Sequence, residues 1–149
     1  QVQLLANVFD DLGCTLGLYN HGGWSGQPQT MVEIAQRLKS ENVGIVYNFH
    51  HGHEHLDQMP DAFTAMLPHL LCVNLNGMAT NGPKILPLAE GEGDAALLRM
   101  VADSAYSGPI GILDHRPETD AELSLRQNLA GMQKLLKELG DKDALATYQ

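Results

Sequence analysis

Apolar residues along the chain recur at two spacings that alternate in a regular order. Over 4–12 they follow a helical period that ends at Gly13, which predicts a helix with a glycine stop. Short and nearly continuous apolar runs, typical of buried strands, follow at 15–20, 43–49, 70–76 and 110–114. Helical periods fill the segments between them. The pattern therefore predicts one helix followed by four strand–helix pairs.

The ends of the predicted helices carry their own signals. Pro28 opens the second helix, and Asp94 is placed to cap the fourth. The last helix is expected to begin at a capping box, Thr119 to Glu122, and to stop at Gly140. Residues 141–149 carry no strong signal and are expected to form a tail.

The spacing of the strands indicates the fold class. They begin near residues 15, 43, 70 and 109, close to the roughly 30 residues per repeat of a barrel built from eight βα units. Helices between successive strands require parallel pairing through right-handed crossovers. We therefore expect an α/β protein, a (β/α)8 TIM barrel of which residues 1–140 form about half. An open doubly wound sheet is the alternative, although no G-x-G-x-x-G follows the first strand.

Length, hydropathy and charge exclude several classes of function. The 149 residues fit one domain, and no stretch approaches the roughly 20 apolar residues that cross a bilayer, so a membrane protein is not expected. A formal charge of -9 repels phosphate backbones, and nucleic acid is not expected as a partner. The composition is that of a soluble protein, and it leaves the compartment open.

Polar side chains gather where each predicted strand ends. Strand by strand they are Tyr19, Asn20 and His21; Asn48, His50, His51 and His53; Asn74 and Asn76; Asp114 and His115. Because a buried amide or imidazole costs a few kcal/mol unless it is hydrogen-bonded, a core alone does not require them. They indicate a polar pocket on the rim where a barrel keeps its active site. Trp24 offers an apolar wall, and Lys84 a contact for a phosphate or carboxylate.

The cluster HHGHEH at 50–55 is a candidate for a divalent cation, because imidazoles close in sequence often share one. On extended backbone, however, His50 and His51 point to opposite faces, so only alternate members reach one ion. The residues leave both a metal site and a metal-free cluster open.

Five strings resemble a known family: LGLYNHGGW, VGIVYNFHHGH, LLCVNLNGM, KILPLAEGEGD and GPIGILDH. They resemble the xylose-isomerase-like TIM barrels, which include sugar phosphate isomerases and ketose epimerases. Within that family they are most similar to a bacterial subgroup known only as sugar isomerase- or epimerase-like. The resemblance runs from about Leu12 to Leu139 and falls on the family's last four βα units, so it implies the C-terminal half of a barrel.

In that family a Glu, an Asp, a His and a second Glu usually hold one divalent metal, and the two Glu also move the substrate proton. Taken strand by strand, the matching positions hold Tyr19, then Asn48 with a retained His51, then Asn74, then Leu113 or Asp114. The resemblance thus implies an Mn, Mg or Zn ion near His51, Asn48 and Asp114. The replaced carboxylates argue against it, because hard divalent ions rely on carboxylate oxygens.

The expected function is that of an isomerase or epimerase that acts on a monosaccharide or sugar phosphate by proton transfer. His21 and His51 are the expected bases because imidazoles titrate near neutral pH, and Tyr19 lies beside them in the pattern. The side chains expected to hold sugar hydroxyls are Asn20, Asn48, Asn74, Asn76 and His115. A non-catalytic sugar-binding or structural barrel is the alternative. An N-terminal half barrel or a second copy of the chain is the expected partner, because half a barrel leaves strand edges unpaired.

Overall fold

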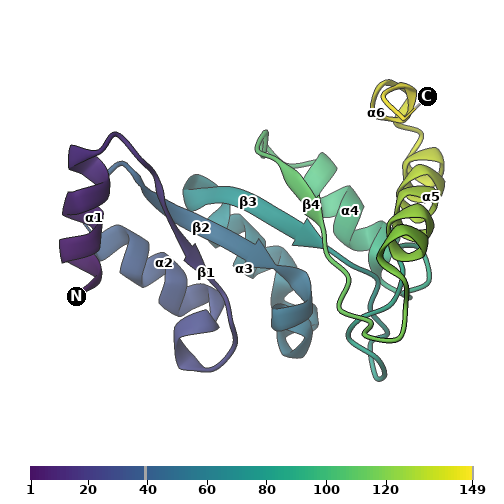
Figure 1. Ribbon diagram of the computed structural model, residues 1–149, viewed down its shortest axis with the longest axis horizontal. Coiled ribbons are helices and arrows are strands. Elements are labelled where there is room, and N and C mark those ends of the chain that lie inside the picture. The colour runs from purple at the N-terminus through teal and green to yellow at the C-terminus, as the bar shows by residue number, and fades with distance from the viewer. Residues whose placement is uncertain (39, 149) are drawn as a thin grey trace. The chain divides into compact units, whose positions relative to one another are not determined.

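The computed structural model describes residues 1–38 and 40–148. Helices and strands alternate along the chain as predicted (Figure 1), with η denoting a 3-10 helix. In chain order the elements are α1 (Val2–Asp11), β1 (Leu16–Tyr19), η1 (Trp24–Gly26), α2 (Pro28–Arg37), β2 (Val43–Asn48), η2 (Phe49–Gln58), α3 (Met59–Met66), η3 (Leu67–His69), β3 (Leu70–Leu75), α4 (Asp94–Ala102), β4 (Ile110–Ile112), α5 (Ala121–Leu139) and α6 (Lys142–Ala146). No helix among the described residues is long and apolar enough to span a membrane.

The chain packs into two compact units. Unit 1 comprises Gln1–Asn74 and Tyr106–Gly111, and it holds most of the sheet. Unit 2 comprises Leu75–Ala105 and Ile112–Gln149, and it holds α4, α5 and α6. The expected tail contains a helix, because the carboxylate of Asp141 accepts from Ala144 N at 2.9 Å and caps α6. Residue 149 lies outside the described residues.

The strands form one sheet in the order β1-β2-β3-β4. β1 and β2 are parallel, and β2 and β3 are parallel with Asn48 opposite Asn74. On the far side of β3, Val73 N donates to the carbonyl oxygen of Pro109, just before β4, at 3.3 Å. Sequential parallel neighbours joined by helices are the arrangement of successive βα units. The predicted α/β class and strand order are therefore confirmed.

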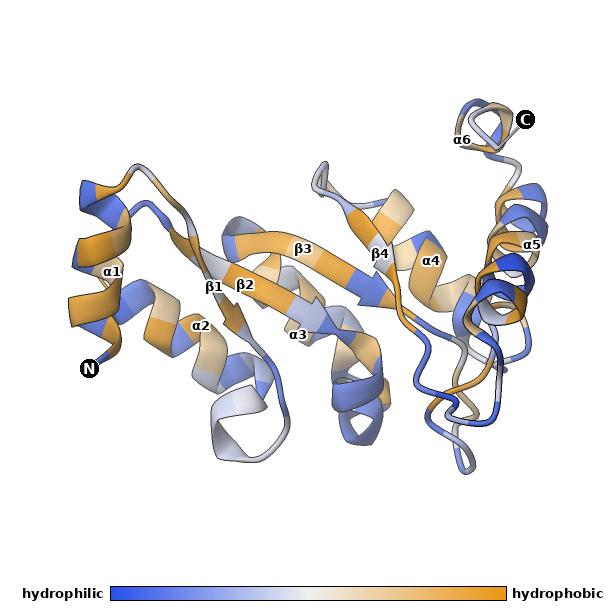
Figure 2. Ribbon diagram, in the orientation of Figure 1, coloured by the Kyte–Doolittle hydropathy of each residue, from blue (hydrophilic) through white to orange (hydrophobic). Residues whose placement is uncertain are grey.

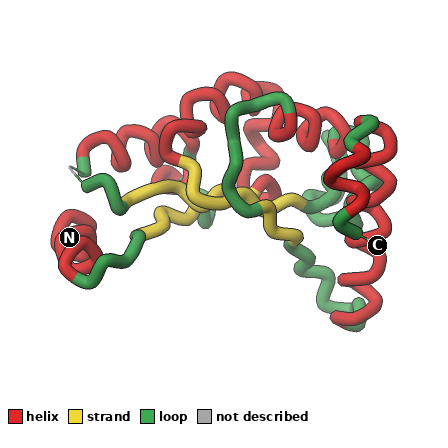
Figure 3. Tube along the Cα trace, turned by 90° about the horizontal axis from the view of Figure 1, so that it is seen from above, coloured by secondary structure: helices red, strands yellow, loops and turns green. Residues whose placement is uncertain are grey.

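The two faces of this sheet differ in burial. One face buries Ile45, Tyr47 and Val73 completely, and α2 and α3 lie along that side of β2 and β3 (Figure 3). On the other face Cys72 is half-buried and Tyr19 is 42% exposed. Figure 2 shows that β2 and β3 are largely apolar and that β3 turns polar at its carboxyl end. The helix-covered face is therefore the core, and the less covered face carries the polar strand ends.

The predicted cap of α4 is wrong. Gly93 is the N-cap, and Asp94 is the first helical residue. The Asp94 side chain is only 3% exposed and turns back into the preceding loop. There its carboxylate accepts from three backbone N–H groups, those of Met78, Ala89 and Gly91. A buried carboxylate takes whichever donors are nearest, and here the loop supplies them.

The predicted cap of α5 is displaced by one residue. Asp120 is the N-cap, and its carboxylate accepts from Glu122 N at 2.9 Å and Leu123 N at 3.1 Å. The box that Thr119 was expected to begin is therefore not formed, because Asp is as strong an N-cap as Thr and stands one residue closer. At the other end Gly140 adopts a left-handed φ of 78°, which confirms the predicted stop.

Candidate functional site

Two buried asparagines join the carboxyl ends of β1 and β2. Asn48 N donates to Asn20 Oδ1 at 2.7 Å, and Asn20 Nδ2 donates to the carbonyl oxygen of Asn48 at 2.8 Å. Both side chains are 0% exposed. The Asn20 amide thus imitates one more pair of ladder bonds beyond the end of β1, and it fixes the strand ends that carry Tyr19 and His21.

The Asn48 side chain has one hydrogen-bonding group to spare. Its Nδ2 donates to the Tyr19 hydroxyl, and its buried Oδ1 has no hydrogen-bond partner among the described residues. If the amide were turned over, the Tyr19 hydroxyl would donate to Oδ1 and the spare group would be the NH2. In either orientation one polar group of Asn48 is left for a ligand or water. Such groups are costly to bury alone, and they often mark sites of binding.

The three residues predicted to be catalytic lie together beside this asparagine pair. The ring centroids of His21 and His51 are 4.8 Å apart, and Tyr19 is 6.0 Å from His21 and 5.9 Å from His51. His21 is exposed and His51 is half-buried. Two imidazoles and a phenol that share one solvent-facing corner can accept, hold and donate a proton.

Trp24 follows this cluster on the loop after β1. Gly22 and Gly23 adopt left-handed φ values of 82° and 64°, a conformation that glycine takes without strain, and they lead into η1. Trp24 begins η1 and is 73% exposed. It is an exposed aromatic side chain, three residues from His21, on a segment that belongs to the same unit.

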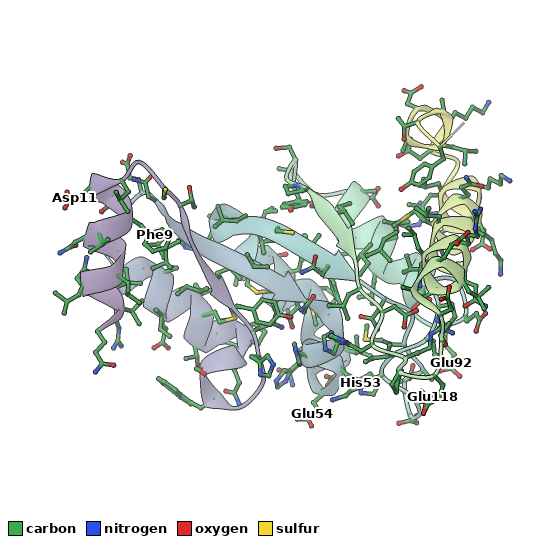
Figure 4. The ribbon with its side chains drawn as sticks, in the orientation of Figure 1. Phe9, Asp11, His53, Glu54, Glu92 and Glu118 are labelled. Atoms are coloured by element: carbon green, nitrogen blue, oxygen red, sulfur yellow. The ribbon has the colours of Figure 1, made fainter. Side chains whose placement is uncertain are left out.

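The histidine-rich segment is not extended, so the predicted alternation of its side chains is wrong. Residues 49–58 form η2, and the rings of His50 and His51 are 3.8 Å apart. His50 is 3% exposed, whereas its neighbour His51 is half-buried and reaches His21. Farther along η2, His53 and Glu54 project near the bottom of the view in Figure 4.

Asn74 is the last residue but one of β3, and it lies on the same face as Asn48, its partner in the parallel register. Its Oδ1 faces Gly111 on the neighbouring strand, where a Cβ atom would lie only 2.1 Å away. Cys72 lies on the same face, with its Sγ 3.7 Å from Asn74 Oδ1. A glycine at position 111 is therefore what makes room for the Asn74 amide.

Unit 2 carries the other residues predicted to bind substrate. Asn76 is 3% exposed, and its Nδ2 donates to the carbonyl oxygens of Gly77 and Lys84 at 2.8 Å. The Lys84 side chain is exposed and makes no ion pair with any described residue. His115 is exposed after β4. Asn76 thus shapes the loop, and Lys84 presents a free charge from it.

Hydrogen bonds from neighbouring side chains occupy the carboxylate of Asp114. Its carboxylate accepts from Arg116 through Nε at 3.0 Å and Nη2 at 2.7 Å, from Ser124 Oγ at 2.6 Å and from Asn128 Nδ2 at 2.9 Å. Arg116, the largest cause, holds the pKa of the Asp114 carboxyl well below its usual range. These four residues line a surface cavity of about 290 Å³ beside the start of α5. No sequence pattern singled out Ser124 or Asn128, because an amide on a helix becomes a carboxylate ligand only through packing.

The residues of this chain do not fit an Mn, Mg or Zn site. Within residues 1–38 and 40–148, no three His, Cys, Asp or Glu side chains are placed to share a metal ion. Both Asp114 oxygens are occupied by the Arg116 guanidinium, which leaves His51 and the Asn48 amide of the ligands that the resemblance implied. One imidazole and one amide oxygen are too few for zinc and too weakly charged for magnesium or manganese.

No protein-family model matches the sequence, and no curated protein matches it. Solved structures do match its fold. A D-tagatose 3-epimerase-like protein superposes with a TM-score of 0.72 at 16% identity, over 95% of this chain and 54% of that one. D-psicose 3-epimerase from Clostridium cellulolyticum H10 gives 0.65 at 14%, over 90% and 52%. A 3-keto-D-glucoside 4-epimerase from E. coli gives 0.72 at 16%, over 89% and 51%.

A fourth match names the architecture. It is a fusion of a xylose isomerase-like TIM barrel with a 4-hydroxyphenylpyruvate dioxygenase, with a TM-score of 0.70 over 90% of this chain. The chain spans about half the length of the three epimerase structures. It therefore has the fold of about half a TIM barrel, and the predicted fold class is confirmed.

Proposed function

We propose that this chain supplies half of the active site of a sugar isomerase or epimerase. The enzyme acts on a monosaccharide or sugar phosphate and moves a proton with His51 and His21 in place of carboxylates. The observation that carries the proposal is the 4.8 Å approach of these two rings at the ends of β1 and β2. The fold shared with three sugar epimerases supports the class of reaction.

The proton transfer runs between the substrate and the imidazoles. His51, in its neutral form, removes the proton on the carbon next to the substrate carbonyl, and the electron pair of that C–H bond forms an enediolate. His21, as imidazolium, returns a proton to the opposite face of the same carbon, which gives an epimer. Alternatively it protonates the former carbonyl carbon while the neighbouring hydroxyl proton passes to the former carbonyl oxygen, which gives an isomer. At the end of the step His51 carries the extra proton and His21 is neutral. Proton exchange with solvent then restores the starting protonation states.

Tyr19 stabilises the negative charge that develops on the carbonyl oxygen. Its hydroxyl accepts from Asn48 Nδ2, so its own proton is directed away from Asn48 and towards the open face. A hydrogen bond to a developing oxyanion is worth more than one to the ground-state carbonyl. The spare acceptor on Asn48 is then positioned for a substrate hydroxyl next to the carbonyl.

Residues farther from this cluster bind the rest of the sugar. Trp24 stacks its exposed ring on the apolar C–H face of the sugar, and Asn74 binds a hydroxyl from the end of β3. Lys84, which the sequence alone suggested for the site, is the group proposed to attract a phosphate or carboxylate. His115 is the proposed hydroxyl contact from the loop after β4, whereas the buried Asn76 shapes the loop after β3.

Four further βα units complete the barrel, either as an N-terminal half or as a second copy of the chain. The support is an unfinished outer surface: α1 buries Ala6 but leaves Leu4, Leu5, Val8 and Leu12 at 69%, 52%, 51% and 69% exposure. Such a stripe normally packs on another helix. Light scattering on this chain alone should find dimers or larger assemblies, and a stable 16.2 kDa monomer would contradict the completion.

A sugar-binding barrel without catalysis is the second candidate. It is favoured by Asp114, because the carboxylate predicted for the site is engaged by Arg116 and is not available as a base. It predicts ligand binding with no exchange of substrate protons.

Proton exchange with solvent tests the two candidates. The natural protein, incubated in D2O with a panel of free and phosphorylated ketoses and aldoses, should place deuterium on the carbon next to the carbonyl, as followed by NMR. His51→Ala should lower that exchange at least a hundredfold. His69→Ala, at the amino end of β3, is the matched control and should leave it unchanged. Binding seen by calorimetry with no deuterium incorporation on any sugar would select the binding barrel instead.

A further inference from the structure

We infer that Asn128 on α5 is a positioning residue that locks the loop between β3 and α4 to the end of β4. By doing so it fixes the place of Lys84, the exposed lysine of that loop. The inference deepens the proposed function and rests on it, because it is in that proposal that Lys84 meets the substrate.

Asn128 uses its whole side chain for this contact. Its Oδ1 accepts from Leu88 N at 3.0 Å, and its Nδ2 donates to Asp114 Oδ2 and to the carbonyl oxygen of Ser124, both at 2.9 Å. The side chain is 1% exposed. Because the amide bonds both the loop at Leu88 and the carboxylate of Asp114, it joins the two segments in one network.

One turn farther along α5, Gly131 brings the same part of the loop into backbone contact. A Cβ atom at position 131 would lie 2.0 Å from the carbonyl oxygen of Leu88. Leu88 itself is 3% exposed. The loop is thus seated on α5 by a hydrogen bond at its N–H and by close packing at its carbonyl, and neither contact tolerates much displacement.

The remainder of the loop follows Leu88 because it is folded back on itself. Gly77 and Leu86 exchange two backbone hydrogen bonds of 2.9 and 2.8 Å, and Asn76 Nδ2 holds the Lys84 carbonyl oxygen at 2.8 Å. Asp94 gathers three further N–H groups of the loop. A loop tied at this many points moves as one piece, so its seat on α5 sets where the Lys84 ammonium group lies.

This arrangement has a consequence for binding. Lys84 has a flexible side chain, and the chain as a whole carries a net charge of -9. That net charge repels an anionic ligand, so the attraction by Lys84 has to act against it. Ordering the loop before the ligand arrives removes part of the entropy that binding would otherwise cost. Asn128 should therefore act on the affinity for an anionic group that Lys84 meets more than on the proton transfer.

The test compares Asn128→Leu with Ser124→Ala in the natural protein. Asn128→Leu removes the Leu88 bond, and hydrogen exchange at the Leu88 amide should become on the order of tenfold faster. Ser124→Ala removes a hydrogen bond to Asp114 but leaves the Leu88 bond, so that amide should exchange as before. If Asn128→Leu does not fold, Gly131→Ala, which pushes on the Leu88 carbonyl, should raise the same exchange rate.

Kinetics complete the test. Asn128→Leu should raise KM for a phosphorylated sugar several-fold with little change in kcat, and in a Lys84→Ala background the same change should no longer raise KM. Unchanged exchange at Leu88, or a KM that rises equally without Lys84, would overturn the inference. A protein that turns over no sugar would instead contradict the proposed function. In that case Leu88 exchange and phosphate binding, measured with and without Asn128→Leu, decide the inference.

Discussion

The ends of β1 and β2 and the end of β4 look alike in the sequence, since each is a buried strand followed by polar residues. At the ends of β1 and β2, the rings of Tyr19, His21 and His51 lie within 6.0 Å of each other, and Asn48 keeps a polar group to spare. At the end of β4, the carboxylate of Asp114 is surrounded by donors from Arg116, Ser124 and Asn128.

The difference shows how a polar strand end is made available or unavailable for chemistry. On unit 1 the asparagine pair bonds the backbone, and beside it the imidazole of His21 is exposed and that of His51 is half-buried. On unit 2 a guanidinium, a hydroxyl and an amide satisfy the carboxylate, so it ties a loop and a helix together. The first end is therefore expected to govern activity and the second to govern stability.

Replacement of His51 should have the largest effect and should be confined to activity. His51→Ala removes the proposed base, so deuterium incorporation should fall by at least a hundredfold. Its side chain is half-buried, and the free energy of unfolding in urea should change by less than about 1 kcal/mol. A variant that loses stability and activity in parallel would assign His51 to the core instead.

Replacement of Asp114 should have the opposite profile. Asp114→Ala leaves the half-buried donors of Arg116 and Ser124 and the buried Asn128 amide without their acceptor, and the free energy of unfolding in urea should fall by about 2 kcal/mol. Proton exchange per folded molecule should persist. Asp61→Ala on α3, an exposed carboxylate, serves as the control and should change stability by less than about 0.5 kcal/mol. Loss of exchange by folded Asp114→Ala would place this carboxylate in the chemistry.

Lowering the pH should reduce the free energy of unfolding through the same carboxylate, that of Asp114. The pKa of Asp114 is lowered in the folded state, chiefly by Arg116, so the unfolded chain binds a proton first as the pH falls. Stability from this group is present above the ordinary Asp pKa, near 3.9, and is lost below it. Urea unfolding between about pH 5 and 2 should show a pH slope that Asp114→Asn reduces.

Asp94 provides the contrasting control for that slope. Its pKa is raised by burial, despite hydrogen bonds from Gly91, Met78 and Ala89 that act the other way. The folded state therefore binds the proton first, and this group favours unfolding as the pH rises through its range. Asp94→Asn should change the pH slope of stability in the opposite sense to Asp114→Asn. Equal effects of the two variants would show that general charge repulsion, rather than Asp114, sets the slope.

Replacement of Tyr19 should have the smallest effect. Tyr19→Phe keeps the ring beside the imidazoles but removes the hydroxyl that meets Asn48, and kcat should fall by about tenfold to a hundredfold. Stability should change by less than about 1 kcal/mol because the side chain is 42% exposed. An unchanged kcat would remove Tyr19 from the mechanism while leaving the imidazole pair in place.

Much of the fold follows from local rules that the sequence states directly. The strands appear within one or two residues of the apolar runs, α2 begins at Pro28, and α5 ends at the left-handed Gly140. Parallel pairing follows from helices between strands. These features depend on backbone preference and hydrophobic period, which act over a few neighbouring residues and can be read one segment at a time.

The polar contacts were decided by tertiary structure. The sequence placed Tyr19, His21 and His51 at strand ends, but their approach depends on η2, whose 3-10 turns put His51 beside His21. Asp94 was expected to cap α4, but its carboxylate accepts from the preceding loop instead. Asp120, rather than Thr119, caps α5, because its carboxylate lies nearest the free helix N–H groups.

The role of Asp114 is the feature that the sequence predicts least well. The alternation of side chains along a strand allowed either Leu113 or Asp114 to face the pocket, and only the packing of α5 settles where the carboxylate goes. Ser124 and Asn128 have no pattern of their own in the sequence, since an i, i+4 pair of polar residues on a helix is typical of a solvated face. The sequence thus determined which elements form and which polar residues end them. Tertiary structure decided which of those residues keep unsatisfied hydrogen-bonding groups, because that depends on donors brought from distant segments.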